Sequence, residues 1–136
     1  MTTKTKYKLK DILKEKGNVS QDEWNIVLGN FLDYFYFELK TPDERVEFLK
    51  GINFDIINDD YRRAFLNSTV RYLINKYIGG YRRSEFKAYY TKKYALNEPT
   101  YPSYAKGKLR LILFLESPVE FMYNNLYVSK NVLDRI

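Results

Sequence analysis

The sequence contains no histidine and no cysteine. These two absences exclude Ser–His and Cys–His catalytic pairs, imidazole and thiolate metal ligands, and any disulfide framework. The six glycines are scattered, so the chain also lacks the glycine-rich loops that cradle phosphates in nucleotide-binding enzymes. We therefore expect a protein that is not an enzyme and that uses neither a cofactor nor a metal ion.

Long apolar runs are also missing. The longest uninterrupted run spans residues 111–115, far short of the ~20 residues that a membrane-spanning helix requires. The N-terminal residues are not followed by the apolar segment of a secretion signal. Because the lack of cysteine also fits a reducing compartment, we expect a cytoplasmic protein that does not associate with membranes.

The chain of 136 residues is long enough for one domain with its own core. We expect a single helical domain over residues 1–136, in which residues 1–6 form a flexible basic arm.

Charge is distributed unevenly along the chain. Residues 18–60 carry a formal charge of −7, whereas residues 61–110 carry +10 together with nine of the fourteen tyrosines. Cationic side chains interleaved with aromatic rings suit a phosphate backbone and stacked bases. Tyrosine and arginine are equally the preferred anchors of protein-binding surfaces. The composition leaves both kinds of partner open.

Three capping boxes mark helix starts, at Ser20, Thr41 and Ser117, each with a glutamate three residues later. Combined with glycines at expected helix ends, the pattern predicts helices near 7–16, 21–40, 42–50, 60–78, 84–96 and 118–127. Residues 108–115 are predicted as helix, although a short strand over 109–115 is the alternative because leucines alternate there. The expected fold is mainly α, a compact bundle of about five to seven helices.

The predicted helix over 84–96 gathers aromatic side chains on one face, and three lysines border or interrupt that face. They are Lys87, Lys92 and Lys93. Lys93 lies near the centre of the face, where burial of an unpaired charge would be costly. Either Lys93 extends along the rings to reach water, or the face is a binding surface.

Further candidate residues flank this helix. Two pairs of arginines lie near predicted helix starts, where the helix dipole disfavours cations. They are Arg62 with Arg63 and Arg82 with Arg83. The first pair can be compensated by Asp59 and Asp60, but the second has only Glu85 nearby. In the loop that follows, Pro99 and Pro102 stiffen the backbone that displays Tyr101 and Tyr104. The predicted partner-binding residues are Arg62, Arg63, Arg82, Arg83, Lys87, Lys92, Lys93, Tyr101 and Tyr104, with Arg82 and Arg83 the first choice.

One pattern superficially resembles the metal-binding arrangement of restriction-endonuclease-like enzymes. Asp59 and Asp60 are followed by Glu85 and Lys87 in a D…(D/E)xK order. In that family these residues lie on adjacent strands, whereas here they fall at the starts of two predicted helices. The aspartates are better explained as charges that stabilise a helix N-terminus.

Two functions therefore remain. The first is a non-enzymatic binding or regulatory protein that engages a protein partner, alone or within a protein–nucleic acid complex. The second is direct nucleic-acid binding, with arginine and lysine on phosphates and tyrosine on bases. A second aromatic stripe, Tyr61, Phe65 and Tyr72, could instead form a homodimer seam or belong to the core.

The Lys-, Asn-, Ile- and Tyr-rich composition is similar to that of proteins from phages and mobile elements of low-GC bacteria. Many such proteins inhibit host enzymes that handle nucleic acid, including CRISPR nucleases. The similarity implies an inhibitor of such an enzyme as the specific form of the first function.

Overall fold

The structure is a computed structural model that describes residues 20–134. Over these residues it is mainly helical and contains no β-strand, which confirms the predicted mainly-α fold. The chain divides into two compact units, an N-terminal unit that ends at Asp59 and a C-terminal unit over Asp60–Asp134. The helix predicted near 7–16 and the arm at 1–6 lie outside the described residues. The single domain stays a prediction.

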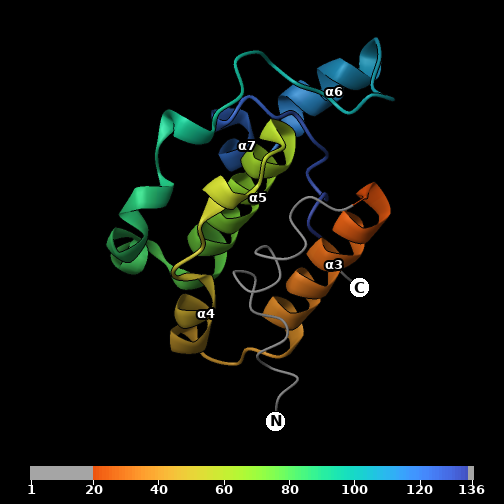
Figure 1. Cartoon of the computed structure of the whole chain (residues 1–136). Helices are drawn as coiled ribbons and strands as arrows, with labels where there is room; N and C mark the ends of the chain where they lie inside the picture. The colour runs from red at the N-terminus through yellow and green to blue at the C-terminus, as the bar shows by residue number, and fades with distance from the viewer. Residues whose placement is uncertain (1–19, 135–136) are drawn as a thin grey trace. The chain divides into compact units, whose positions relative to one another are not determined.

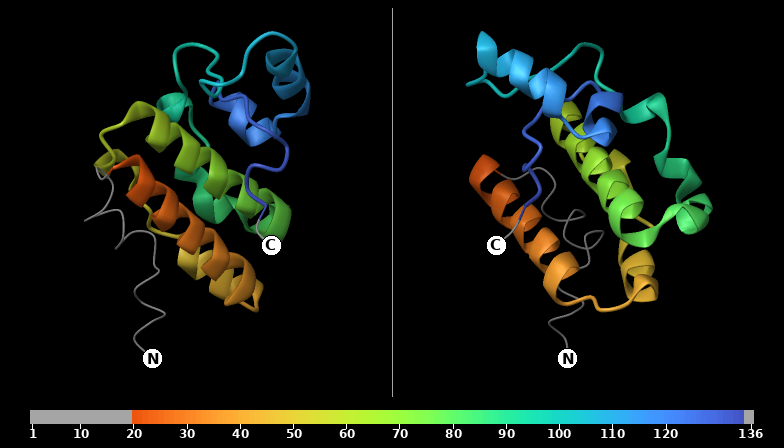
Figure 2. Two further views of the ribbon diagram at one scale, coloured as in Figure 1. Left: turned by 90° about the vertical axis from the view of Figure 1, so that its right-hand side faces the viewer. Right: turned by 180° about the vertical axis from the view of Figure 1, so that it is seen from behind.

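The N-terminal unit is built on two capped helices, α3 (Gln21–Phe37) and α4 (Pro42–Leu49), joined by a short connection (Figure 2). Ser20 Oγ accepts a hydrogen bond from the Glu23 amide at 3.3 Å. Thr41 forms a complete capping box, in which Thr41 Oγ1 accepts from the Glu44 amide and Glu44 Oε1 accepts from the Thr41 amide. Both predicted helix starts are confirmed.

Aromatic contacts hold α3 to α4. The Phe48 ring lies 5.2 Å from both the Phe31 and the Tyr34 ring centroids. A 3₁₀ turn, η1 (Phe54–Ile56), completes the unit. Within α3, Trp24, Phe31, Leu32 and Phe35 are buried, whereas Ile26 and Phe37 are exposed.

The C-terminal unit is organised around α5 (Asp60–Leu73), which continues into a π-helical turn, η2 (Ile74–Ile78). The segment ends at Gly79, whose φ of 98° suits glycine and whose amide donates to the Ile74 carbonyl. The predicted helix over 60–78 is therefore right in extent, but its last turn is π rather than α. The short helix α7 (Val119–Tyr123) packs beside α5 (Figure 1).

The helix predicted over 84–96 is wrong. This region forms a 3₁₀ segment, η3 (Gly80–Tyr89), which is kinked at Phe86, and a separate turn, η4 (Lys92–Tyr94). An α-helix would pair the Tyr89 carbonyl with the Lys93 amide. Instead the Tyr89 carbonyl accepts from Asn67 Nδ2 at 3.1 Å, and the Lys93 amide donates to Thr91 Oγ1 at 3.3 Å. A contact with α5 and a local cap thus replace the helical ladder.

Residues Lys108–Glu116 form α6, so the alternative of a strand over 109–115 is wrong. The capping box predicted at Ser117 is also wrong. Pro118 occupies the N-cap position of α7, and the helix reaches only Tyr123. The Ser117 hydroxyl instead donates to the Val128 carbonyl at 2.8 Å and accepts from the Val128 amide at 2.6 Å. The hydroxyl that was predicted to cap α7 is therefore bonded to Val128, in the segment that follows α7.

Candidate functional site

Five side chains of the C-terminal unit alternate between cation and tyrosine ring. In order of contact they are Arg83, Tyr90, Arg71, Tyr123 and Lys92. Arg83 lies 5.6 Å from the Tyr90 centroid, Arg71 lies 4.8 Å from Tyr90 and 4.7 Å from Tyr123, and Lys92 lies 4.2 Å from Tyr123. All four distances fall within the range of cation–π attraction. We call this group the cation–tyrosine stack.

The stack is assembled from α5, the 3₁₀ segments and the end of α7. Arg71 belongs to the last turn of α5, Arg83 to η3 and Lys92 to η4. The Tyr90 hydroxyl donates to Asn75 Oδ1 at 3.1 Å, and Asn75 Nδ2 donates to Glu120 Oε2 at 2.8 Å. Asn75 lies in the π-helical turn, so that turn fixes Tyr90 and joins a carboxylate to the group.

Arg71 is the buried member of the stack, with 5% of its surface exposed. Its Nε and Nη1 atoms are buried and have no hydrogen-bond partner within residues 20–134. Burial lowers the pKa of Arg71, against the opposing effects of Tyr90, Tyr123 and Glu120. Burial raises the pKa of Tyr90, although Arg83 and Arg71 oppose the rise. Desolvation thus dominates at the centre of the stack.

A second feature of the same unit is the outer surface of α6. Leu111, Ile112, Phe114 and Leu115 are between 46% and 73% exposed, whereas Leu113 is buried against Ala105 and Tyr127. At 100° per residue, these four exposed side chains cover an arc of about 160° around the helix. We call them the α6 apolar face. A single buried residue leaves most of this apolar helix in contact with water.

A series of ring contacts fixes α6 to the loop before it. Arg110 lies 5.0 Å from the Tyr101 centroid, Tyr101 stacks on Tyr127 at 5.0 Å, and Tyr127 stacks on Phe114 at 5.3 Å. Arg110 Nε also donates to the Ala105 carbonyl at 3.0 Å. Phe114 thus belongs to the α6 apolar face and also anchors it, because its half-exposed ring stacks on Tyr127.

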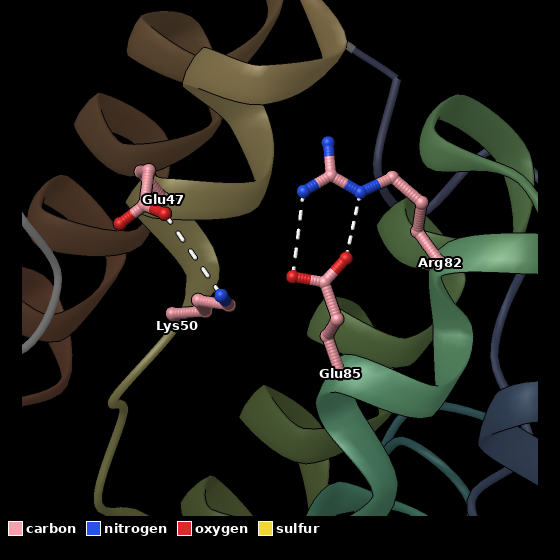
Figure 3. Close-up of polar contacts among 4 residues, drawn as sticks. All are labelled: Glu47, Lys50, Arg82 and Glu85. Atoms are coloured by element: carbon pink, nitrogen blue, oxygen red, sulfur yellow. Dashed lines mark hydrogen bonds and ion pairs between the residues drawn. The ribbon is translucent and has the colours of Figure 1, made fainter.

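The predicted site residues fall into different surroundings. Arg82, a first choice for partner contacts, is engaged by Glu85 through two hydrogen bonds of 2.7 and 3.3 Å, as Figure 3 shows. Figure 3 also shows the looser pair Glu47–Lys50, 3.9 Å apart in the N-terminal unit. Near the start of α5, Arg63 pairs with Asp60, which is the compensation expected from the sequence.

The remaining predicted residues are partly brought together. Arg83 and Lys92 join the cation–tyrosine stack, and Lys87 and Lys93 are exposed. Tyr104 is 70% exposed, whereas Tyr101 is half-buried in the contacts that fix α6. Arg62 is half-buried in α5. Of the second aromatic stripe, Phe65 packs edge-on against Phe121 at 5.2 Å and Tyr61 stacks on Phe65. The homodimer stays a prediction.

Arg71, Tyr123 and the α6 apolar face were not predicted as site features. No sequence pattern near Arg71 indicates its role, because the two rings that it contacts, Tyr90 and Tyr123, are distant in the sequence. The signal for α6 was present in the run of five apolar residues at 111–115. A helix with that run exposes apolar side chains unless neighbours surround it on several sides.

Among residues 20–134, every helix is too short or too polar to cross a lipid bilayer. The same residues contain no cluster of three or more acidic side chains arranged to hold a metal ion. Comparison with protein-family models, with curated proteins and with solved structures finds no match to this chain.

Proposed function

We propose that this protein is a non-enzymatic binding and regulatory protein that docks on a protein partner through the α6 apolar face. The observation that supports the proposal is the exposure of Leu111, Ile112, Phe114 and Leu115 on one helix. Contiguous apolar surface is unfavourable in water and marks sites where proteins associate. A bare polyanion would gain little from four large apolar side chains.

The geometry of α6 fits a groove on the partner. Leu111 and Leu115 are four residues apart and lie on the same side of the helix, with Ile112 beside them. Amphipathic helices that enter apolar grooves use this spacing of anchors. The occupant of the α6 apolar face is thus a protein with an apolar groove.

The charged residues beside α6 indicate which charge the rim of the partner's groove should carry. Lys106, Lys108 and Arg110 are exposed around the N-terminal end of the helix, where the dipole already carries partial positive charge. The N-cap residue is Gly107, which has no side chain, and the Leu109 and Arg110 amides already donate to the Lys106 and Gly107 carbonyls. Carboxylates on the partner would complement the three cations, so the partner's groove has an acidic rim.

The specific form of the proposal is inhibition of a host nucleic-acid-handling enzyme. Two observations support it. The composition is similar in style to proteins of phages and mobile elements, and the C-terminal unit combines the apolar face with the basic segment 61–110. A basic inhibitor complements acidic patches on such an enzyme or contacts its nucleic-acid complex.

The test compares capture of proteins from a low-GC bacterial lysate by three forms of the chain. They are the wild type, Leu111→Gln/Leu115→Gln, and the control Ile26→Gln, which alters an exposed apolar residue of α3. We expect the wild type and the control to capture a protein that the double variant does not capture. This capture should persist after the lysate is treated with nuclease. Equal capture by all three forms would contradict the proposal.

Direct nucleic-acid binding is the second candidate, and the cation–tyrosine stack favours it. A direct binder should lose affinity for DNA or RNA steeply between ~50 and ~200 mM salt, with a slope set by the phosphates neutralised. Absence of binding to either polymer at ~50 mM salt would eliminate this candidate.

A further inference from the structure

We propose that the cation–tyrosine stack is a binding site for a phosphate group, held by Arg71, Arg83 and Lys92. Two independent observations point to it. The first is that three cations contact two shared rings, Tyr90 and Tyr123. The negative charge of Glu120 raises the pKa of both Arg71 and Tyr90. In addition, the buried Arg71 has N–H groups without an acceptor within residues 20–134.

The unpartnered N–H groups of Arg71 are the centre of the site. Ring contacts attract the guanidinium through the aromatic quadrupole, but they provide no oxygen for Nε and Nη1. A buried donor without an acceptor costs free energy that a bound oxygen would recover. Phosphate oxygens match the fork of guanidinium donors, and their bonds to arginine are charge-assisted.

Arg83 and Lys92 extend the site to the surface. Both are exposed and each contacts a ring that also contacts Arg71. Rotamer changes of exposed side chains such as Lys92 and the half-exposed Tyr123 are fast, and they open a path to the buried guanidinium. Once bound, a dianionic phosphate balances the excess of positive charge among these residues.

Glu120 limits the position of the phosphate. Its Oε2 atom accepts from Asn75 Nδ2, so this carboxylate is held on the side of the π-helical turn. Glu120 repels a phosphate, so the phosphate must bind away from this carboxylate. Arg83 and Lys92, at the two ends of the stack, contribute attraction from the surface.

The phosphate can belong to a free anion or to a nucleic-acid backbone, and two titrations distinguish these sources. The first adds inorganic phosphate to the full chain and compares it with sodium chloride at matched ionic strength. The second adds a short single-stranded DNA. Each follows the Arg71 Nε–H resonance and the ring resonances of Tyr90 and Tyr123 by NMR.

We expect a saturable shift of the Arg71 resonance with phosphate, with DNA or with both, and none of comparable size with chloride. Shifts with DNA alone assign the site to polymer phosphates, whereas shifts with both show that the free group is sufficient. The same shift with chloride, or no shift with either ligand, would overturn the proposal.

Matched variants separate the site from general surface charge. Arg83→Ala/Lys92→Ala removes two exposed cations of the stack, and Lys106→Ala/Lys108→Ala removes two exposed lysines elsewhere in the same unit. We expect the first pair to weaken binding at least about tenfold and the second pair to weaken it far less. Equal weakening would reduce the effect to non-specific attraction and overturn the site.

This site is independent of the docking function proposed for α6. Leu111→Gln/Leu115→Gln leaves every residue of the stack unchanged, so phosphate binding should persist in that variant. The two proposals can therefore fail separately.

Discussion

Asn124 Nδ2 donates a hydrogen bond to Asn67 Oδ1 at 2.9 Å, and both side chains are fully buried. The same amide of Asn124 lies 2.9 Å from Ser68 Oγ, and Asn67 Nδ2 donates to the Tyr89 carbonyl. One polar group on α5 thus ties together the end of α7 and the end of η3. The positions of Tyr90 and Tyr123, each one residue away from these contacts, depend on this network.

Replacement of Asn124 by alanine should destabilise the C-terminal unit. The change removes the donor to Asn67 Oδ1 and leaves a buried acceptor unpaired, which costs about 1–3 kcal/mol of unfolding free energy. Urea denaturation measures the change. The control is Asn131→Ala, an exposed position where we expect less than about 0.5 kcal/mol. Equal losses at the two positions would show that the network contributes nothing.

Ser117→Ala tests the contact that replaced the predicted cap. The Ser117 hydroxyl satisfies both the amide and the carbonyl of the buried Val128. Alanine would leave both groups without their partner, and we expect a loss of about 1–3 kcal/mol in unfolding free energy. Ser103→Ala, in the exposed loop before α6, is the control. If Ser117 acted only as a surface residue, the two variants would unfold at the same urea concentration.

The parts of the fold that the sequence predicts correctly are those determined locally. Thr41 and Glu44 are three residues apart, and their capping box forms in the structure as the spacing predicts. The helix over 84–96 failed for the opposite reason. Its ladder is broken by Asn67, which is 22 residues from the Tyr89 carbonyl it binds. No pattern within 84–96 contains that information.

In the candidate site, too, the sequence predicts the local features and misses the contacts between distant residues. Composition identified Arg83 and Lys92 as basic residues near aromatic ones, but it could not show that they share rings with Arg71. That relation joins residues 71, 90 and 123, which three separate elements bring together. The sequence also ranked Arg82 with Arg83, although local geometry directs Arg82 to Glu85.

Arg82 and Arg83 should therefore behave differently. Because Arg82 is held by Glu85, Arg82→Ala should change phosphate affinity less than Arg83→Ala, whose cation belongs to the stack. The Arg82–Glu85 pair itself should contribute roughly 0.2–1 kcal/mol in a double-mutant cycle with Glu85→Ala, as partly exposed ion pairs do. A larger effect of Arg82→Ala on phosphate binding would restore the ranking inferred from the sequence.

Leu113 and Leu115 provide a matched comparison within α6. Leu113 is buried, and Leu113→Ala should lower the unfolding free energy by about 2–5 kcal/mol. Leu115 is exposed, and Leu115→Ala should change it by less than about 0.5 kcal/mol. Partner capture should show the reverse order, with the loss at Leu115. A large destabilisation by Leu115→Ala would mean that the α6 apolar face is part of the core.

Tyr90 should make stability fall at alkaline pH. Its pKa is raised by burial above the ordinary value of 10.0, so the folded chain keeps this proton where the unfolded chain loses it. The contribution is fully present below pH 10 and is lost as the pH rises through the folded-state pKa. We expect the stability difference between wild type and Tyr90→Phe to shrink above about pH 10.

Urea denaturation from about pH 8 to about pH 11 measures this dependence. At neutral pH, Tyr90→Phe should cost about 0.5–1.5 kcal/mol, because the hydrogen bond to Asn75 Oδ1 is lost. Tyr104→Phe is the control, since that ring projects into solvent. A stability difference for Tyr90→Phe that is independent of pH would contradict the assignment.

The π-helical turn at Ile74–Ile78 has a consequence for the spacing of the chain. Its closing bond joins the Gly79 amide to the Ile74 carbonyl, so the turn holds one residue more than an α-helical turn. Deleting one residue there would leave the same bond in an α-helical turn, so the segment after Gly79 would keep its place, whereas a deletion within α5 would rotate that segment by about 100° about the helix axis. Tyr90 and Arg83 would leave Arg71 only in the second case, although every side chain of the stack was still encoded. The π-helical turn should therefore tolerate the loss of one residue better than α5 does.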